Sequence, residues 1–139
     1  MTDILRQPSA PEAEVLQAAA QLVHAFASND TARYFDCFSA DATFVFHTLP
    51  APLTSRRAYQ DLWQQWQTEG FAVLGCESSN GQVSVHGDVA IFIHDVATHL
   101  RIGAEELHLR ERESIVFRLE GQKWVAWHEH LSVGPEAQS

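Results

Sequence analysis

Four long segments separated by two-residue breaks make up the second half of this chain, and this spacing restricts the fold more than any other feature. The segments are residues 71–86, 89–102, 106–120 and 123–133, and the breaks are Gly87-Asp88, Gly103-Ala104 and Gly121-Gln122. A break of two residues joins only antiparallel neighbours. The spacing therefore predicts a four-stranded antiparallel meander.

One further turn signal lies inside the first of these segments. Asn80-Gly81 is a typical hairpin turn, but it can also mark a bulge in one long strand. We favour the bulge, because a small curved sheet needs a bend of this kind.

The first half of the chain predicts three helices and one short strand. The first helix runs from Glu12 to the breakers Ser28-Asn29-Asp30, and its apolar stripe has helical spacing. Asp30 or Thr31 then caps a short second helix that ends before Asp41, and residues 43–48 form a strand. The third helix begins at Thr54 or Ser55 and ends at Gly70. Its buried stripe consists of Tyr59, Leu62, Trp63 and Trp66.

Composition and charge exclude several classes of function. The chain has 139 residues, which fit one domain, and 45% of them are hydrophobic, which is typical of a folded globule. A formal net charge of −9 argues against nucleic acid or an anionic membrane as a partner. No apolar run approaches the length of a membrane span, so we expect a cytoplasmic protein. Cys37 and Cys76 lack metal-binding spacing, and we expect two free thiols.

Three short motifs carry a resemblance to a known family. The ending Gly121 to Ser132, GQKWVAWHEHLS, resembles the glycine, tryptophan and His-x-His-x-Ser ending of SnoaL-like proteins in the NTF2-like superfamily and of kinase association domains. Asp41-Ala42-Thr43-Phe44 and Gly87-Asp88-Val89-Ala90 are similar to further signatures of this group. The resemblance implies an α+β fold, the NTF2-like (cystatin-like) cone, with three N-terminal helices packed on a curved antiparallel sheet. We expect a domain over residues 12–133, with flexible ends at 1–11 and 134–139.

The same resemblance, combined with strand alternation, indicates a pocket. Alternate residues of a strand share a face, and the more apolar face of the last strand contains Trp127 and Glu129. The resemblance places His94 and Arg112 inward on the two preceding strands. His94 and Glu129 are then candidate acid/base residues. The candidate ligand-binding residues are Arg112, Tyr34, Phe46, Trp63, Phe92, Ser114 and Trp127.

Other interpretations of these residues stay open. Burial alone would turn Arg112 outward, because Ile115 and Phe117 lie on the opposite face of its strand. An inward Arg112 therefore requires a covered convex face, as a homodimer would provide. Arg112 and Glu129 could also form a buried ion pair, with His94 as a hydrogen-bonded core histidine.

His128 and His130 are expected on the convex face. A metal there would need a third ligand, and none is identifiable in the sequence, so we expect neither a metal nor a cofactor. Ketosteroid isomerase resembles the chain in fold outline, but its catalytic aspartate maps to Phe46 and its helix-one tyrosine maps to about Leu22. The isomerase mechanism is therefore not carried over to this chain.

Two functional hypotheses follow from the sequence. In the first, the pocket binds a small, mostly apolar molecule that carries a carboxylate or carbonyl, and acid/base chemistry of the isomerase, lyase or hydrolase type takes place there. In the second, the chain is a non-catalytic association module that dimerises through its convex sheet face, and its pocket is vestigial. The sequence does not identify the ligand, and it leaves open whether the chain is an enzyme.

Overall fold

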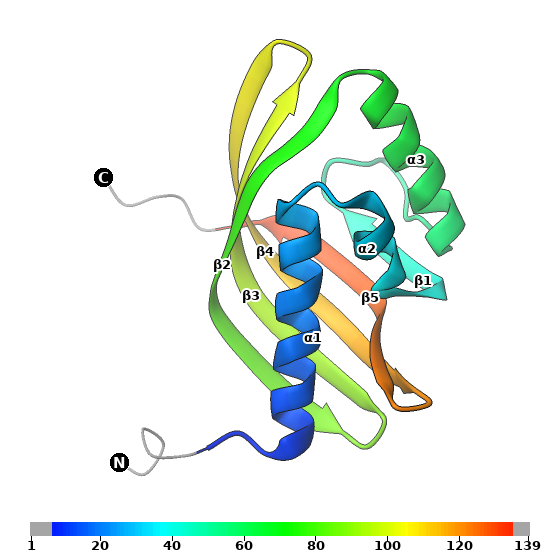
Figure 1. Ribbon diagram of the computed structural model, residues 1–139, viewed down its shortest axis with the longest axis vertical. Helices are drawn as coiled ribbons and strands as arrows, with labels where there is room; N and C mark the ends of the chain where they lie inside the picture. The colour runs from blue at the N-terminus through cyan, green and yellow to red at the C-terminus, as the bar shows by residue number, and fades with distance from the viewer. Residues whose placement is uncertain (1–6, 135–139) are drawn as a thin grey trace.

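Three helices lie along one side of a curved five-stranded sheet in the computed structural model, which describes residues 7–134 (Figure 1). The strand order is β1-β5-β4-β3-β2. The elements are α1 (Ala10–Ala27), α2 (Thr31–Asp36), β1 (Phe38–Phe46), α3 (Arg56–Thr68), β2 (Phe71–His86), β3 (Val89–Ile102), β4 (Glu105–Glu120) and β5 (Lys123–Val133). This arrangement confirms the predicted α+β class. No helix in the described residues has the length and apolarity needed to cross a membrane.

The predicted meander is confirmed, because β2, β3, β4 and β5 pair in sequence order and antiparallel. The first strand differs from the prediction in two ways. It begins at Phe38 rather than residue 43, and it pairs with β5 in parallel, so the sheet is mixed. The helix α2 ends at Asp36, because Phe38 packs into the aromatic core, with its ring 5.1 Å from the rings of both Tyr34 and Phe44.

Local capping signals explain where the helices begin and end. Ser9 forms a capping box with Glu12, so α1 begins at Ala10, inside the stretch that we expected to be a flexible end. The rest of that expectation concerns residues 1–6 and 135–139, which lie outside the described residues. Ser55 caps α3 as predicted. Gly70 then ends this helical segment with a φ of +97°, a conformation that glycine adopts without steric cost.

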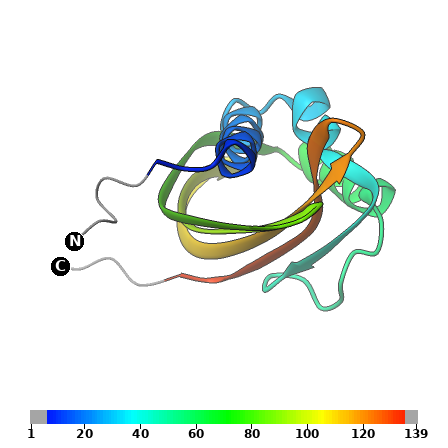
Figure 2. The same cartoon turned by 90° about the horizontal axis from the view of Figure 1, so that it is seen from below.

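The strand pairing shifts at several places and the sheet bends, and two of these bulges bear on the site. The pairing of β2 with β3 shifts between Ser79 and Gln82, which confirms the bulge predicted at Asn80-Gly81. A second bulge, which the sequence did not reveal, lies in β5, where Phe117 pairs with Ala126 but Val116 pairs with His128. Bulges increase local twist and bend, and Figure 2 shows the sheet curling toward the helices.

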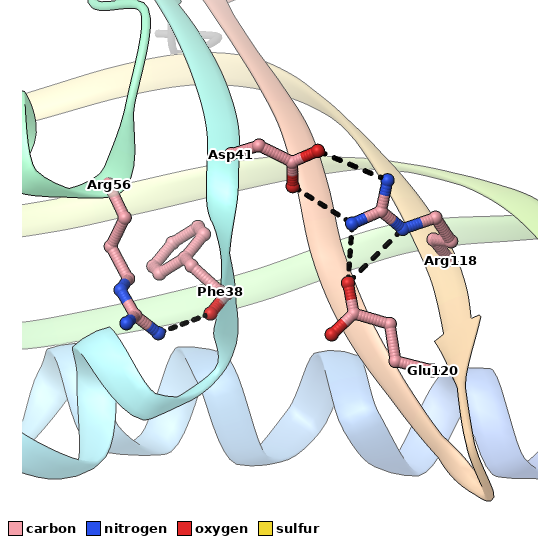
Figure 3. Close-up of polar contacts among 5 residues, drawn as sticks. All are labelled: Phe38, Asp41, Arg56, Arg118 and Glu120. Carbon is pink, nitrogen blue, oxygen red and sulfur yellow. Dashed lines mark hydrogen bonds and ion pairs between the residues drawn. The ribbon is translucent and has the colours of Figure 1, made fainter.

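The second bulge determines where Trp127 lies. Trp127 is the extra residue, so Ala126 and Glu129 both point to the concave side although they are three positions apart. Trp127 is 37% exposed, and the guanidinium of Arg118 lies 4.6 Å from its ring centre. Figure 3 shows the same guanidinium bound to Asp41 of β1 and to Glu120 at the end of β4. Arg118 therefore links β4 to β1 across the intervening β5 on the convex side.

An aromatic cluster forms the core between the helices and the sheet. Trp63 is 1% exposed, and its indole nitrogen donates a hydrogen bond to Thr31 over 3.1 Å. Its ring lies 5.2 Å from that of Tyr34 and 6.1 Å from that of Tyr59. These contacts hold α2 and α3 together above the sheet. In Figure 3, Arg56 of α3 also donates to the carbonyl of Phe38, over 2.9 Å.

The different surroundings of two tryptophans lead to a first prediction. Trp63→Ala should lower the free energy of unfolding by about 3–5 kcal/mol, because it leaves a cavity in a close-packed core. Trp127→Ala should cost about 1 kcal/mol or less, because that ring lies on the surface. Urea denaturation followed by far-UV circular dichroism measures both. Equal losses in the two variants would contradict the outward position of Trp127.

Candidate functional site

A cavity of about 530 Å³ lies between the helices and the concave face of the sheet. Its wall is mostly apolar. The helices contribute Leu22, Phe26, Tyr34, Tyr59, Trp63 and Trp66, and the sheet contributes Phe46, Val96, Leu100, Leu109 and Leu131. The volume falls within the range of roughly 300–1,000 Å³ that is usual for small-molecule sites.

Three buried glutamates form the polar part of this cavity. Glu111 and Glu113 project from β4, and Glu129 projects from β5. They are 6%, 9% and 2% exposed, respectively. Glu111 accepts a hydrogen bond from His47, with 2.6 Å between the nitrogen and the oxygen. Burying three carboxyl groups costs free energy unless they are paired or protonated, so each needs a partner or a proton.

A line of hydrogen bonds crosses three consecutive strands beneath the cavity. Ser78 on β2 contacts Nδ1 of His94 on β3 over 2.6 Å. Nε2 of His94 contacts Oε1 of Glu113 on β4 over 2.7 Å, and these two residues are direct cross-strand partners. Glu129 on β5 is the diagonal neighbour of Glu113 on the same face of the sheet, since Glu113 pairs with Leu131 and Ile115 pairs with Glu129. Ser78 is exposed at the edge strand, so the line provides a route for a proton between the cavity and solvent.

Glu129 is the least satisfied of the buried glutamates. Its Oε2 is buried and has no hydrogen-bond partner in the described residues. Burial raises the pKa of Glu129 well above its ordinary value, and the nearby charge of Glu113 raises it further. Both effects favour the protonated form of the Glu129 carboxyl. Burial also raises the pKa of Glu111, although the hydrogen bond with His47 opposes this shift.

Two tyrosines lie beside the glutamates. The hydroxyl groups of Tyr34 and Tyr59 are 2.9 Å apart, and both residues are buried. Burial raises the pKa of each phenol well above its ordinary value, and the charge of Glu129 contributes to both shifts. Both phenols are therefore neutral and can serve as hydrogen-bond donors.

Most of the predicted pocket residues on the helices and first strand reach the cavity. Tyr34, Phe46, Trp63 and Glu129 line it. His94 is 1% exposed and lies behind Glu113 instead of on the wall. Its carboxylate neighbour is Glu113, whereas we expected Glu129. Phe92 also points inward, but it packs on the His94 ring at 4.6 Å instead of lining the cavity.

Three predicted ligand-binding residues lie on the wrong side of the sheet. Arg112 points to the convex side, where it bonds to Asp95 over 2.8 Å with its side chain 53% exposed. Ser114 lies on the same face, since it has the same parity in β4. Trp127 is turned outward by the bulge. The burial pattern of Ile115 and Phe117 decided the face of β4, and the inward placement of Arg112 drawn from the resemblance was wrong.

The site also contains residues that sequence reasoning missed, two of them on the inward face of β4. Glu111 and Glu113 share a face with Ile115 and Phe117, so the apolar end of β4 already indicated which of its charged residues point inward. Tyr59 was assigned only to the buried stripe of its helix. His47 lies just after β1 and carried no spacing signal.

The remaining reactive side chains offer weaker alternatives. His128 and His130 have ring centres 6.5 Å apart, and within residues 7–134 no group of three potential ligands is arranged to hold a metal. Cys37 and Cys76 are free thiols, as predicted. Cys76 lines the cavity, but burial raises its pKa to about 11, so it is not a thiolate nucleophile at neutral pH.

Comparisons with solved structures support the fold. A candidate calcium/calmodulin-dependent kinase II association domain from Exiguobacterium sibiricum is 14% identical, with a TM-score of 0.77 over 95% of this chain and 99% of that one. An NTF2-like protein of unknown function from Pseudomonas putida is 18% identical, with a TM-score of 0.73 over 96% and 93%. An NTF2-like protein of unknown function from Prochlorococcus is 15% identical, with a TM-score of 0.75 over 94% and 97%. At these identities the likeness shows the NTF2-like fold alone.

Comparison at the sequence level identifies the family. A search among curated proteins found no significant match. The model of the SnoaL-like domain, however, matches residues 15–136, which include every strand, α2, α3 and most of α1. This chain therefore belongs to the SnoaL-like domain family.

Proposed function

We propose that this chain binds a small, mostly apolar molecule in the cavity, with a polar group of that molecule at Glu129. The observation that carries the proposal is the Oε2 atom of Glu129, which is buried without a partner on the wall of an otherwise apolar cavity. A buried polar atom of this kind costs free energy, and a ligand with a matching polar group would remove that cost.

The line of hydrogen bonds behind Glu129 supports acid/base chemistry as a further step. The pKa of Glu129 is raised, and Glu113 beside it is joined to His94, which in turn contacts Ser78. A carboxyl group with a raised pKa can give a proton to a ligand and recover it at neutral pH. In this proposal Glu129 is the acid or base, and His94 is a positioning residue that acts through Glu113.

Filling the cavity tests the binding proposal. Val96 lies on the cavity wall, and Val96→Phe should occupy part of the space and lower the affinity for a neutral apolar dye by about tenfold or more. N-phenyl-1-naphthylamine is a suitable dye, because its fluorescence rises in apolar surroundings. Val116→Phe is the matched control, since it makes the same change on the convex face. Equal dye binding by the parent protein and both variants would exclude the cavity as the site.

The protonation of Glu129 has a measurable effect on stability. In the unfolded chain Glu129 titrates near 4.5, whereas in the folded protein its pKa is raised. The folded protein therefore binds more protons between these two values, and Glu129 destabilises it as the pH rises through that window. Glu129→Gln removes this effect. Its stability relative to the parent should increase by about 1.4 kcal/mol per pH unit above pH 4.5 until the raised pKa is reached.

Urea denaturation at a series of pH values measures this difference. Glu77→Gln is the control, because Glu77 lies exposed on β2, and its difference from the parent should vary little with pH. A pH-independent difference for Glu129→Gln would show that the Glu129 carboxyl has an ordinary pKa in the folded protein.

The convex face of the sheet supports a second candidate function, homodimerisation. Ile91, Ile93 and Trp127 are 38%, 39% and 37% exposed on this face, while the described helices lie on the concave side. Neighbouring strands bring these side chains into one region, because Ile91 pairs with Val116 and Val116 pairs with His128 beside the bulge. Exposed apolar side chains grouped in this way are typical of contact surfaces.

Sedimentation equilibrium at micromolar concentration tests the dimer. We expect the parent protein to sediment as a dimer and Ile93→Asp to sediment as a monomer, because the new carboxylate would be buried without a partner. Ile102→Asp is the control, since Ile102 is also exposed but lies by the cavity. A monomeric parent protein would exclude this association.

A further inference from the structure

We propose that the molecule bound in this cavity carries a protonated amine, whose ammonium group lies at Glu129 while its apolar body lies against the aromatic wall. This inference rests on the proposed function, because it names the class of molecule that the cavity binds. It also changes the ligand expected from the sequence. A carboxylate ligand was expected to bind Arg112, but Arg112 lies on the other face of the sheet.

The charges on the cavity wall are the first observation that indicates the charge of the ligand. Four residues of the wall are glutamates, namely Glu69, Glu111, Glu113 and Glu129, and no lysine or arginine of residues 7–134 lines it. In a site of low dielectric, this arrangement repels an anionic group and attracts a cation. Carboxylates, sulfates and phosphates are therefore disfavoured as ligand groups, and an organic cation is favoured.

Among the three buried glutamates, Glu129 is the one without a histidine partner. His47 contacts Glu111 and His94 contacts Glu113, so each of these two histidines already bonds to one carboxyl group. The Oε2 atom of Glu129 has no hydrogen-bond partner among residues 7–134, although the residue is only 2% exposed. An ammonium group has three hydrogen-bond donors and a full positive charge, and it forms the stronger, charge-assisted type of hydrogen bond with a carboxylate.

The aromatic rings around Glu129 suit the same cation. Tyr34, Tyr59 and Phe46 all line the cavity, and the Phe46 and Tyr59 rings lie 5.2 Å apart. Glu129 lines the same cavity, and its charge raises the pKa of both phenols. Aromatic faces attract ammonium groups. Farther along the wall, Trp63, Trp66 and Leu100 supply surface for an apolar body.

Binding of the amine requires a proton to leave the site. Burial favours the protonated form of Glu129, so the protonated amine and the ionised carboxylate form a pair only when the carboxyl proton passes to solvent. The line through Glu113, His94 and Ser78 gives that proton a route. The titratable groups that interact with Glu129 are Glu111, Glu113, Tyr34, Tyr59, Cys37 and Cys76, and His47 and His94 lie behind Glu111 and Glu113. Because no lysine or arginine stands among them, the amine is the cation that would stabilise the ionised Glu129.

A set of matched probes tests this inference on the full chain. Three apolar bodies, n-octyl, 1-adamantyl and 2-(2-naphthyl)ethyl, are each used as the amine, the alcohol and the carboxylate. Isothermal titration calorimetry at pH 6 and pH 7, in phosphate and in ACES buffers of different ionisation enthalpy, gives the affinity and the number of protons released. The variants are Glu129→Gln and, as a control for net charge, Glu77→Gln on the exposed part of β2.

We expect the amine to bind about tenfold more tightly than the alcohol on the best-fitting body, with the carboxylate at least about tenfold weaker than the alcohol. Amine binding should release about one proton and should strengthen as the pH rises, whereas alcohol binding should do neither. Glu129→Gln should remove both the amine preference and the proton release, so that the amine and the alcohol bind it with similar affinity. Glu77→Gln should behave as the parent protein does.

The alternative outcomes separate the two proposals. Alcohols or carboxylates that bind as tightly as the amines would overturn the amine inference and leave the proposed binding function in place. An amine preference that survives in Glu129→Gln, or that disappears in Glu77→Gln, would also overturn it, because the cation would then not be held at Glu129. Failure of all nine probes, together with failure of the neutral dye, would reject the binding function itself.

Discussion

The buried carboxyl pair of Glu113 and Glu129 is the constraint to which the rest of the site is fitted. Two carboxylates this close in an apolar environment cannot both be ionised without a large electrostatic cost, so one of them retains a proton. His94 is held between Glu113 and Ser78 by hydrogen bonds to both ring nitrogens, which fixes the orientation of its ring. Burial and the neighbouring charge of Glu113 both raise the pKa of Glu129, which favours the proton on the Glu129 carboxyl.

The position of this pair depends on how the sheet bends. Without the bulge in β5, regular alternation from Ala126 would direct Glu129 to the convex side. The extra residue restores the inward direction after Ala126 and leaves Trp127 outside, under Arg118. One strand thus packs Trp124 and Ala126 against the core and then presents Glu129 and Leu131 to the cavity. The bulge allows the same sheet to build both a closed core and an open site.

Local signals predicted most of the fold. The glycine breaks gave the strand boundaries because two-residue turns allow few connections, and Asn80-Gly81 gave the first bulge because Asn tolerates its φ of 55°. The parallel pairing of β1 with β5 could not be predicted, since it joins segments more than 80 residues apart and no short connection restricts it. The bulge at Trp127 was missed because it lacks a Gly or Asn signal and leaves the apolar pattern of β5 almost unchanged.

The candidate site was predicted less well, for a reason that β4 makes clear. Its sequence alternates Glu111, Arg112, Glu113 and Ser114, so charge alone does not say which face is inside. Ile115 and Phe117 are buried, and side chains alternate between the two faces of a strand. The inward direction of these two residues therefore fixes the face of every other residue in β4. Evidence from the chain's own burial pattern therefore outweighed a resemblance that concerned other sequences.

A purely structural explanation accounts for part of the polar cluster and fails at one atom. Cross-strand pairing of His94 with Glu113, and of His47 with Glu111, is what a satisfied buried network requires. It does not explain why Glu129, with the rest of its strand apolar on that side, carries a carboxyl whose Oε2 has no hydrogen-bond partner among residues 7–134. A leucine at this position would stabilise the core more, since a buried ionisable group destabilises the fold at neutral pH. Local costs of this kind are typical of functional sites, and for that reason Glu129, more than the better-bonded His94, is the residue at which we propose that a ligand binds.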